Sequence, residues 1–291
     1  MRVSVIIPSL NAPTLSRALN AVLAQSQPAD EIIVVGRDEA GALAACPTAR
    51  FIDTGAPVCA ARARNLGMAA ATGDLFLLLD ADCIPRPDWL AQHAGRQAAG
   101  ERVVGGAVAL QGSNYWAQSD NVSMFHEFVP QHPPGPRFLL PTLNLSVRRE
   151  VFERAGGLDE SFPGAAAEDA DWTIRIRRAG YRLYFEPAAM VAHAPARTTR
   201  HDVARHWRNL GHNAIRVRLR YADEFGTPRG ARRAGWWRAL SPLIAARITA
   251  GIYADRALWP HWRSLPVVYW TKLLYCLGAA RAIDSGFATQ P

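Results

Sequence analysis

The chain has 291 residues, 49% of them apolar and 20% charged, which excludes a largely disordered chain and predicts one large domain, or one domain with an appendage. Its four cysteines show no C-x-x-C spacing, so neither a zinc site nor a disulfide framework is indicated, and reduced thiols in the cytosol fit best. The net charge of +8 is uneven: residues 1–200 carry 19 basic and 20 acidic side chains, whereas residues 201–291 carry 14 and 5.

Strands and helices are expected to alternate over the first hundred residues. An apolar strand at Val3–Ile7 begins too early to leave room for a signal peptide, and cap residues then open a helix through about Ala24. Further strands are expected at Ile32–Val35 and Arg50–Asp53, followed by a helix from Pro57. This order predicts βαβ units and a parallel sheet, for which a nucleotide is the expected ligand. The sequence contains no Gly-rich phosphate loop, so a metal ion is expected to hold the phosphates.

The stretch Leu75–Leu79 is an unbroken apolar run, typical of a strand buried on both faces. Asp80 and Asp82 follow it directly. In extended chain, side chains two residues apart point the same way, so these carboxylates can converge on one divalent cation at the carboxyl end of the strand, where open α/β sheets bind ligands. Two carboxylates that merely end a strand are the alternative.

The next hundred residues contain a second acidic cluster. A strand is expected within Glu101–Leu110, an irregular stretch at Gln111–Pro136 because of its prolines, and a strand at Phe138–Val147. Glu168 and Asp169 then open a helix that ends at Gly180. Acidic side chains at this end interact favourably with the helix dipole, so capping alone could explain them. A strand ending at His193 follows.

The last ninety residues are basic and hold six of the nine tryptophans. Asp202–Tyr221 has apolar residues at alternating spacings of 3 and 4, which predicts an amphipathic helix. The apolar segments Leu243–Leu258 and Leu265–Ala280 are interrupted by charges and are too short to span a bilayer, so interfacial or re-entrant helices are expected. Tryptophan beside arginine at their ends suits the lipid headgroup layer, although a nucleic acid could also bind such a segment.

Four blocks of this sequence occur in the order found in one family: VSVIIPSLN, ARNLGMAAATGDLFLLLDADCIP, LNLSVRREVFERAGGLDESF and AAAEDADWTIRIRRAGYRLYFEPAAMVAH. Together they resemble the inverting, metal-dependent family 2 glycosyltransferases over roughly residues 1–200. The resemblance implies an α/β fold of the GT-A nucleotide-diphospho-sugar transferase type, with a mostly parallel central sheet flanked by helices. Residues 1–200 are expected to form the catalytic domain, with a nucleotide-binding half (1–100) and an acceptor-side half (101–200). The basic, Trp-rich residues 201–291, which the resemblance does not cover, are expected to form a C-terminal helical membrane-associating extension.

The resemblance also implies roles for individual residues. Asp169 matches the catalytic base, and Glu168 its neighbour that contacts the acceptor or orients the site. A divalent cation, Mn or Mg, is expected on Asp80 and Asp82, with His193 as the third ligand or else as a structural histidine. The nucleotide-binding positions carried over are Pro8, Ser9, Asn11, Asp38, Arg64 and Asp80.

Three further positions leave alternatives open. Family members commonly have an acidic pair directly after the second strand that reads the base, but here Gly36 and Arg37 precede Asp38, so the identity of the base, usually uracil, is in doubt. Asn144 matches a position near the sugar, or is a buried structural residue. Trp172 supports the acceptor or packs in the core.

The resulting hypothesis is an inverting glycosyltransferase that moves a sugar from a nucleotide-diphosphate donor, expected to be a UDP-sugar, to a glycan or lipid-linked acceptor of the cell envelope. Peripheral contact of the C-terminal segment with the cytoplasmic side of the cell membrane is expected, and no nucleic acid partner. The alternative is a non-catalytic GT-A-like module that binds a membrane or a nucleic acid.

Overall fold

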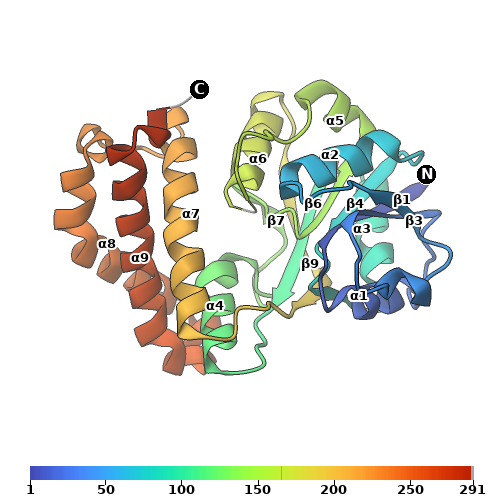
Figure 1. The fold of residues 1–291 in the computed structure, drawn as a ribbon, viewed down its shortest axis with the longest axis horizontal. Helices are drawn as coiled ribbons and strands as arrows, with labels where there is room; N and C mark the ends of the chain where they lie inside the picture. Colours follow the sequence, from blue (N-terminus) through green and yellow to red (C-terminus); the bar gives the residue numbers. More distant parts are fainter. Residues whose placement is uncertain (165, 290–291) are drawn as a thin grey trace. The chain divides into compact units, whose positions relative to one another are not determined.

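The computed structural model describes residues 1–164 and 166–289. The chain divides into two compact units, here called the first unit (Met1–Ala109 and Glu127–Ala194) and the second unit (Leu110–His126 and Pro195–Pro291). Figure 1 shows a sheet flanked by helices in the first unit and helices alone in the second. The second unit therefore takes a short central segment of the chain together with its last hundred residues.

The strands of the described residues form one nine-stranded mixed sheet in the order β3-β2-β1-β4-β8-β6-β9-β5, with β7 paired to β9. The first four strands in this order are parallel to one another, as the βαβ pattern predicts. Antiparallel pairs join β4 to β8, β8 to β6, and β9 to β5 and β7, while β6 and β9 are parallel. The bounds are β1 Val3–Leu10, β2 Glu31–Arg37, β3 Arg50–Asp53, β4 Leu75–Leu79, β5 Cys83–Pro85, β6 Val103–Ala109, β7 Gly135–Pro136, β8 Asn144–Arg148 and β9 Leu183–His193.

Helices cover the sheet through apolar faces. In α1, the buried positions Leu15, Ala18, Leu19 and Val22 follow helical spacing and form one stripe. Helix α2 approaches β1 closely, since a Cβ at Gly67 would lie 2.4 Å from a methyl carbon of Ile6. The helices of this unit are α1 Leu15–Leu23, α2 Ala60–Ala70, α3 Trp89–Ala98, α5 Arg149–Ala155 and α6 Glu168–Arg178, with a 3₁₀ turn η1 at Ala42–Ala45 and η2 at His126–Phe128, where the second unit gives way to the first.

Two local predictions were wrong. Residues 115–125 form a helix, α4 (Tyr115–Phe125), within the stretch expected to be irregular, because the prolines of that stretch all lie beyond the helix. The side chain of Asn114 caps α4 by accepting hydrogen bonds from the backbone N–H groups of Trp116 and Ala117. The strand expected from Phe138 begins only at Asn144.

The second unit is built on α4, α7 (Arg200–Arg220), α8 (Ala234–Ala254) and α9 (Leu265–Asp284). Helix α7 buries Val203 and Trp207 along the predicted stripe. It packs closely against α9, since a Cβ at Gly211 would lie 2.0 Å from the carbonyl oxygen of Tyr275. Short 3₁₀ segments complete the unit: η3 (Arg229–Arg232), η4 (Arg256–Ser264) and η5 (Phe287–Thr289). Across the described residues, none of the helices combines the length and apolar character that a bilayer crossing requires, as the interrupting charges predicted.

A buried polar network lies between the helices of the second unit. Asp120 of α4 is fully buried, and its carboxylate accepts hydrogen bonds from Trp207 Nε1 and Arg197 Nε, both at 2.8 Å. Lys272 of α9 is also buried; its Nζ donates to the carbonyl oxygen of Ser123 at 2.9 Å and lies 4.2 Å from the centre of the Trp207 ring. Because buried charges are costly unless they are paired, this network fixes how α4, α7 and α9 pack.

Candidate active site

Asp80 and Asp82 lie at the carboxyl end of β4, whose five residues are all buried. Two hydrogen bonds to backbone carbonyl oxygens hold this turn in place. The hydroxyl of Thr14, just before α1, donates to the carbonyl oxygen of Ala81 at 2.8 Å, and the Ala194 N–H donates to that of Asp82 at 2.8 Å. The side chains of Asp80 and Asp82 keep 28% and 30% of their surface exposed, so both carboxylates can meet a ligand from solvent.

Arg64 of α2 connects this turn to the second acidic cluster. One guanidinium nitrogen lies 2.7 Å from a carboxylate oxygen of Asp80, and another lies 2.9 Å from one of Glu168. The Arg64 side chain is only 3% exposed. Burial alone would lower the pKa of Arg64, but the charges of Asp80 and Glu168 outweigh burial and raise it. Arg64 is therefore a permanent cation between two carboxylates from distant parts of the chain.

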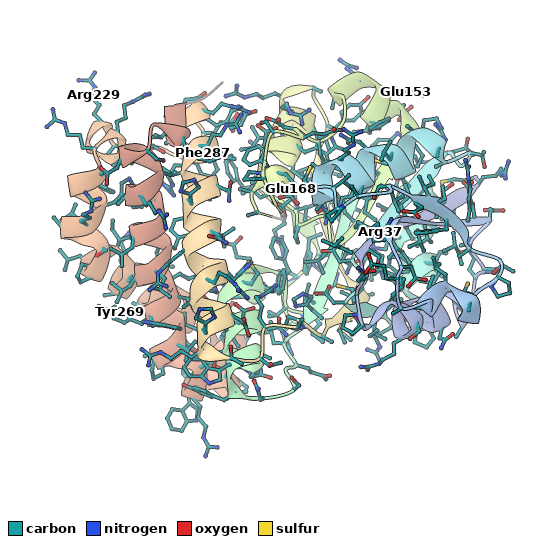
Figure 2. All side chains as sticks on the ribbon, viewed as in Figure 1. Arg37, Glu153, Glu168, Arg229, Tyr269 and Phe287 are labelled. Carbon is teal, nitrogen blue, oxygen red and sulfur yellow. The ribbon has the colours of Figure 1, made fainter. Side chains whose placement is uncertain are left out.

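Glu168 and Asp169 open α6, and Glu168 points from this helix toward Arg64 in the interior of the first unit (Figure 2). Burial, and next the charge of Asp169, raise the pKa of Glu168 to about 7, although Arg64 opposes the rise. Burial also raises the pKa of Asp169. Raised pKa values on two adjacent carboxyl groups are typical of residues that accept or donate a proton in catalysis.

The interior of this cluster contains unsatisfied polar atoms. Among the described residues, neither Glu168 Oε2 nor Arg64 Nε has a hydrogen-bond partner, although both atoms are buried. Ala167, which precedes the helix, has φ 71°, a left-handed conformation that costs a non-glycine residue roughly 1 kcal/mol or more. Strain and unpaired buried polar atoms at one place are typical of a functional site.

Asp82 also faces His193, at the end of β9. His193 Nε2 lies 3.4 Å from a carboxylate oxygen of Asp82, whereas Asp80 is turned to Arg64. Within the parts of the chain that the structure describes, no three His, Cys, Asp or Glu side chains are gathered as a ligand set. Carboxylate oxygen and imidazole nitrogen are suitable donors for Mn²⁺ or Mg²⁺, so Asp82 and His193 fit as two ligands of a divalent cation.

The predicted base-binding positions surround the end of β1. Ser9 is buried, Pro8 is half-buried and Asn11 is exposed with φ 53°. Asn11 is held to the loop that follows β2, because its side-chain oxygen accepts a hydrogen bond from the Glu39 N–H at 2.8 Å. Both carboxylate oxygens of Asp38 accept backbone N–H groups of η1 at 2.9 Å, so this side chain caps its own loop.

Trp172 and Asn144, for each of which the sequence leaves two roles open, are buried structural residues. Trp172 is fully buried, and its Nε1 donates to the carbonyl oxygen of Gly156 at 2.8 Å. Asn144 is fully buried too. Its side-chain oxygen accepts hydrogen bonds from two side chains of α3, and its side-chain nitrogen donates to two backbone carbonyl oxygens of the sheet. Burial also lowers the pKa of His93, which bonds Asn144, to about 4. Trp172 and Asn144 therefore support the site from the core.

Sequence reasoning missed how the site is assembled. The resemblance implies a contact of Arg64 with the nucleotide, and a solvated helix arginine is the alternative that the sequence leaves open. Neither anticipates that Arg64 joins Asp80 to Glu168. Nothing in the sequence marks Ala167, because alanine has no preference for a left-handed conformation. The hydroxyl of Thr14 holds the turn between the two aspartates, whereas the sequence indicates for Thr14 only a place among the residues that cap the following helix.

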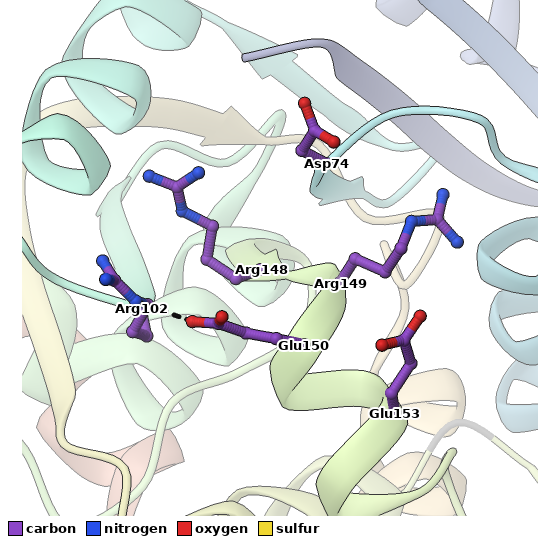
Figure 3. Close-up of a pocket in the computed structure, with 6 residues that line it drawn as sticks. All are labelled: Asp74, Arg102, Arg148, Arg149, Glu150 and Glu153. Atoms are coloured by element: carbon purple, nitrogen blue, oxygen red, sulfur yellow. Dashed lines mark ion pairs between the residues drawn. The ribbon is translucent and has the colours of Figure 1, made fainter.

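A cavity of about 330 Å³ lies elsewhere in the first unit (Figure 3). It opens where β4 begins, beside Asp74, whereas Asp80 follows the other end of that strand. Three of its charged side chains bond to the protein itself: Arg102 pairs with Glu150 at 2.7 Å, and Arg149 donates to the carbonyl oxygens of Ala71 and Gly73. This cavity is therefore separate from the acidic site.

Known proteins share this fold and sequence. Residues 4–156 match the family described as Glycosyl transferase family 2. Glycosyltransferase AglE of Haloferax volcanii is 30% identical over 209 residues, 67% of each chain. The N-acetylglucosaminyl-diphospho-decaprenol L-rhamnosyltransferase of Mycobacterium tuberculosis is 29% identical over 153 residues, 53% of this chain and 45% of that one. The mannosyltransferase PcManGT from Pyrobaculum calidifontis, solved in complex with GDP-Man and Mn²⁺, has a TM-score of 0.62 at 20% identity and covers 96% of this chain and 86% of its own.

The mixed sheet with an acidic turn at the carboxyl end of its interior strand β4 is thus the GT-A fold of glycosyltransferases, and the predicted fold class is confirmed. The chain belongs to glycosyl transferase family 2 and is an enzyme of the glycosyltransferase class.

Proposed function

We propose that this enzyme transfers a sugar, with inversion, from a nucleotide-diphosphate donor to a hydroxyl group of a glycan or lipid-linked acceptor of the cell envelope. The observation that carries the proposal is the cluster in which Arg64 joins Asp80 to Glu168, next to Asp169. The lipid-linked acceptor is supported by the mycobacterial relative, whose name specifies a decaprenol diphosphate substrate. A peripheral position on the cytoplasmic side of the cell membrane fits such an acceptor.

Asp169 is the proposed catalytic base. It takes the proton of the acceptor hydroxyl while the acceptor oxygen bonds to the anomeric carbon and the bond from that carbon to the diphosphate breaks. Its raised pKa strengthens it as a base, and a positioned base contributes about 10² to 10⁴ in rate. Glu168 orients the site through Arg64. No second carboxylate is assigned as a nucleophile, so a single displacement with inversion follows.

Asp82 and His193 are the proposed cation ligands, and Asp80 contacts the ribose or a metal-bound water. A bound divalent cation, Mn²⁺ or Mg²⁺, supplies positive charge to the departing diphosphate. The solved mannosyltransferase of this fold was obtained with Mn²⁺ and GDP-Man. The donor proposed for this enzyme is a UDP-sugar, as in most of the family it resembles.

Calorimetry tests the donor site directly. UDP-, GDP- and dTDP-sugars are titrated with and without Mn²⁺ into wild type, into Asp82→Ala, and into Asp88→Ala as a control at an exposed aspartate near the start of α3. Metal-dependent binding of one donor that is lost only in Asp82→Ala is expected. If no donor binds under either condition, the proposal of a nucleotide-diphosphate donor bound through Asp82 fails.

A further inference from the structure

Two tryptophans of the second unit are exposed, in contrast to others nearby. Trp259 and Trp262, both in η4, are 56% and 64% exposed. Trp207 and Trp237 of the same unit are 2% and 3% exposed. The Trp237 indole donates to the carbonyl oxygen of Ala231, so this tryptophan belongs to the core. Two segments of this unit, residues 236–238 and 259–263, each hold two tryptophans and an arginine, and the structure leaves both indoles exposed only in the second segment.

The exposed tryptophans stand on an ordered segment. Trp259 Nε1 donates to the carbonyl oxygen of Tyr253 at 3.1 Å, and the Tyr253 hydroxyl donates to that of His261 at 3.0 Å. Leu258 and Ser264, at 1% and 2% exposure, anchor η4 in the unit. Because these contacts fix the backbone, the indoles can bind a partner without the entropic cost of ordering the segment.

Cationic and aliphatic side chains surround the indoles. The guanidinium of Arg256 lies 5.6 Å from the centre of the Trp259 ring, and that of Arg263 lies 5.7 Å from the Trp262 ring. Leu265, at the start of α9, is 43% exposed. Indole and leucine favour the boundary between headgroups and acyl chains, and guanidinium groups favour anionic headgroups. A nucleic acid would gain little from the exposed leucine.

We propose that η4 and the start of α9, through Arg256, Trp259, Trp262, Arg263 and Leu265, form the surface by which this protein binds a bilayer of anionic phospholipid. Residues 201–291 carry 14 basic and 5 acidic side chains, so the charge of this part of the chain complements the charge of the lipid. The surface deepens the membrane position proposed above and is independent of the transferase chemistry.

The full-length protein is sedimented with phosphatidylcholine vesicles that contain or lack phosphatidylglycerol. We expect binding to the anionic vesicles that weakens about tenfold or more in Trp259→Ser/Trp262→Ser, and also in Arg256→Gln/Arg263→Gln. The control Leu23→Ser/Phe51→Ser removes exposed apolar residues of the first unit and should bind as wild type does. Donor binding by each variant shows that the fold is intact and separates this test from that of the proposed function.

Three results would overturn the proposal: no binding of wild type to anionic vesicles, equal binding by the tryptophan variant, or equal loss in the control. A short RNA, titrated in parallel, distinguishes the other partner class. Tighter binding of RNA than of vesicles, lost in the same tryptophan variant, would reassign η4 to nucleic acid.

Discussion

Replacing Glu168 by Gln changes the charge of the most deeply buried carboxylate of the site while preserving its shape and its ability to accept a hydrogen bond from Arg64. The pKa of Glu168 is about 7 in the folded chain and near 4.5 without its surroundings. Between these values the folded state holds a proton that the unfolded state has lost. Wild-type stability should therefore fall as the pH rises from about 4.5 to about 7, and the neutral variant should not share this loss.

The structure supplies the magnitude. The gap between 4.5 and 7 corresponds to a free energy of about 3 kcal/mol, and the 4% exposure of the Glu168 side chain means that solvent screens little of it. The quantity to compare is the unfolding free energy of Glu168→Gln minus that of wild type. This difference should be about 3 kcal/mol larger at pH 8 than at pH 4.5. The transferase activity of Glu168→Gln should fall, because the charge that orients Arg64 is gone.

Urea unfolding of both proteins across pH 4.5 to 8 measures this difference, with Glu153→Gln as a control at an exposed glutamate. The control should show a constant difference from wild type at every pH. Parallel stability curves for wild type and Glu168→Gln would refute the reasoning, because they would show that the folded protein ionises Glu168 without penalty.

Other substitutions test the same assembly. Asp169→Asn should keep donor binding but lower transfer about 10²-fold or more, measured by product formation, and an active variant would remove Asp169 from the role of base. Gly36→Ala should destabilise the first unit by about 3 kcal/mol or more, because φ is 134° and a Cβ would lie 1.9 Å from the carbonyl oxygen of Ser9; unchanged thermal unfolding would contradict this. Ala167→Gly should relieve the left-handed strain and raise stability by about 1 kcal/mol, whereas a loss would show that the conformation is not strained.

The parallel part of the fold was predictable because each element has a strong local signal. Leu75–Leu79 and Arg50–Asp53 are strands at the predicted residues, and the acidic helix begins at Glu168 as expected. The antiparallel pairing of β8 between β4 and β6 had no such signal, since strand order depends on contacts between distant segments. Helix α4 was missed because nearby prolines outweighed the cap residue Asn114.

The candidate site was predictable as a set of residues but not as an assembly. The spacing of Asp80 and Asp82 follows from the period of an extended chain, and the position of Asp169 from the start of a helix. The ion pairs of Arg64 join residues 16 and 104 positions apart, and no sequence pattern encodes such a contact. The role of Asp38 was likewise hidden, because only the structure shows that its carboxylate caps η1.

Lys272 is the only lysine of the chain, and it is buried against Trp207 and Ser123. Amine-reactive reagents will therefore find no side-chain target on the folded protein and will label the α-amino group alone. Acylation of Lys272 requires α4, α7 and α9 to separate. The rate at which a second acyl group is added, monitored by intact-mass spectrometry, therefore measures how often the second unit opens.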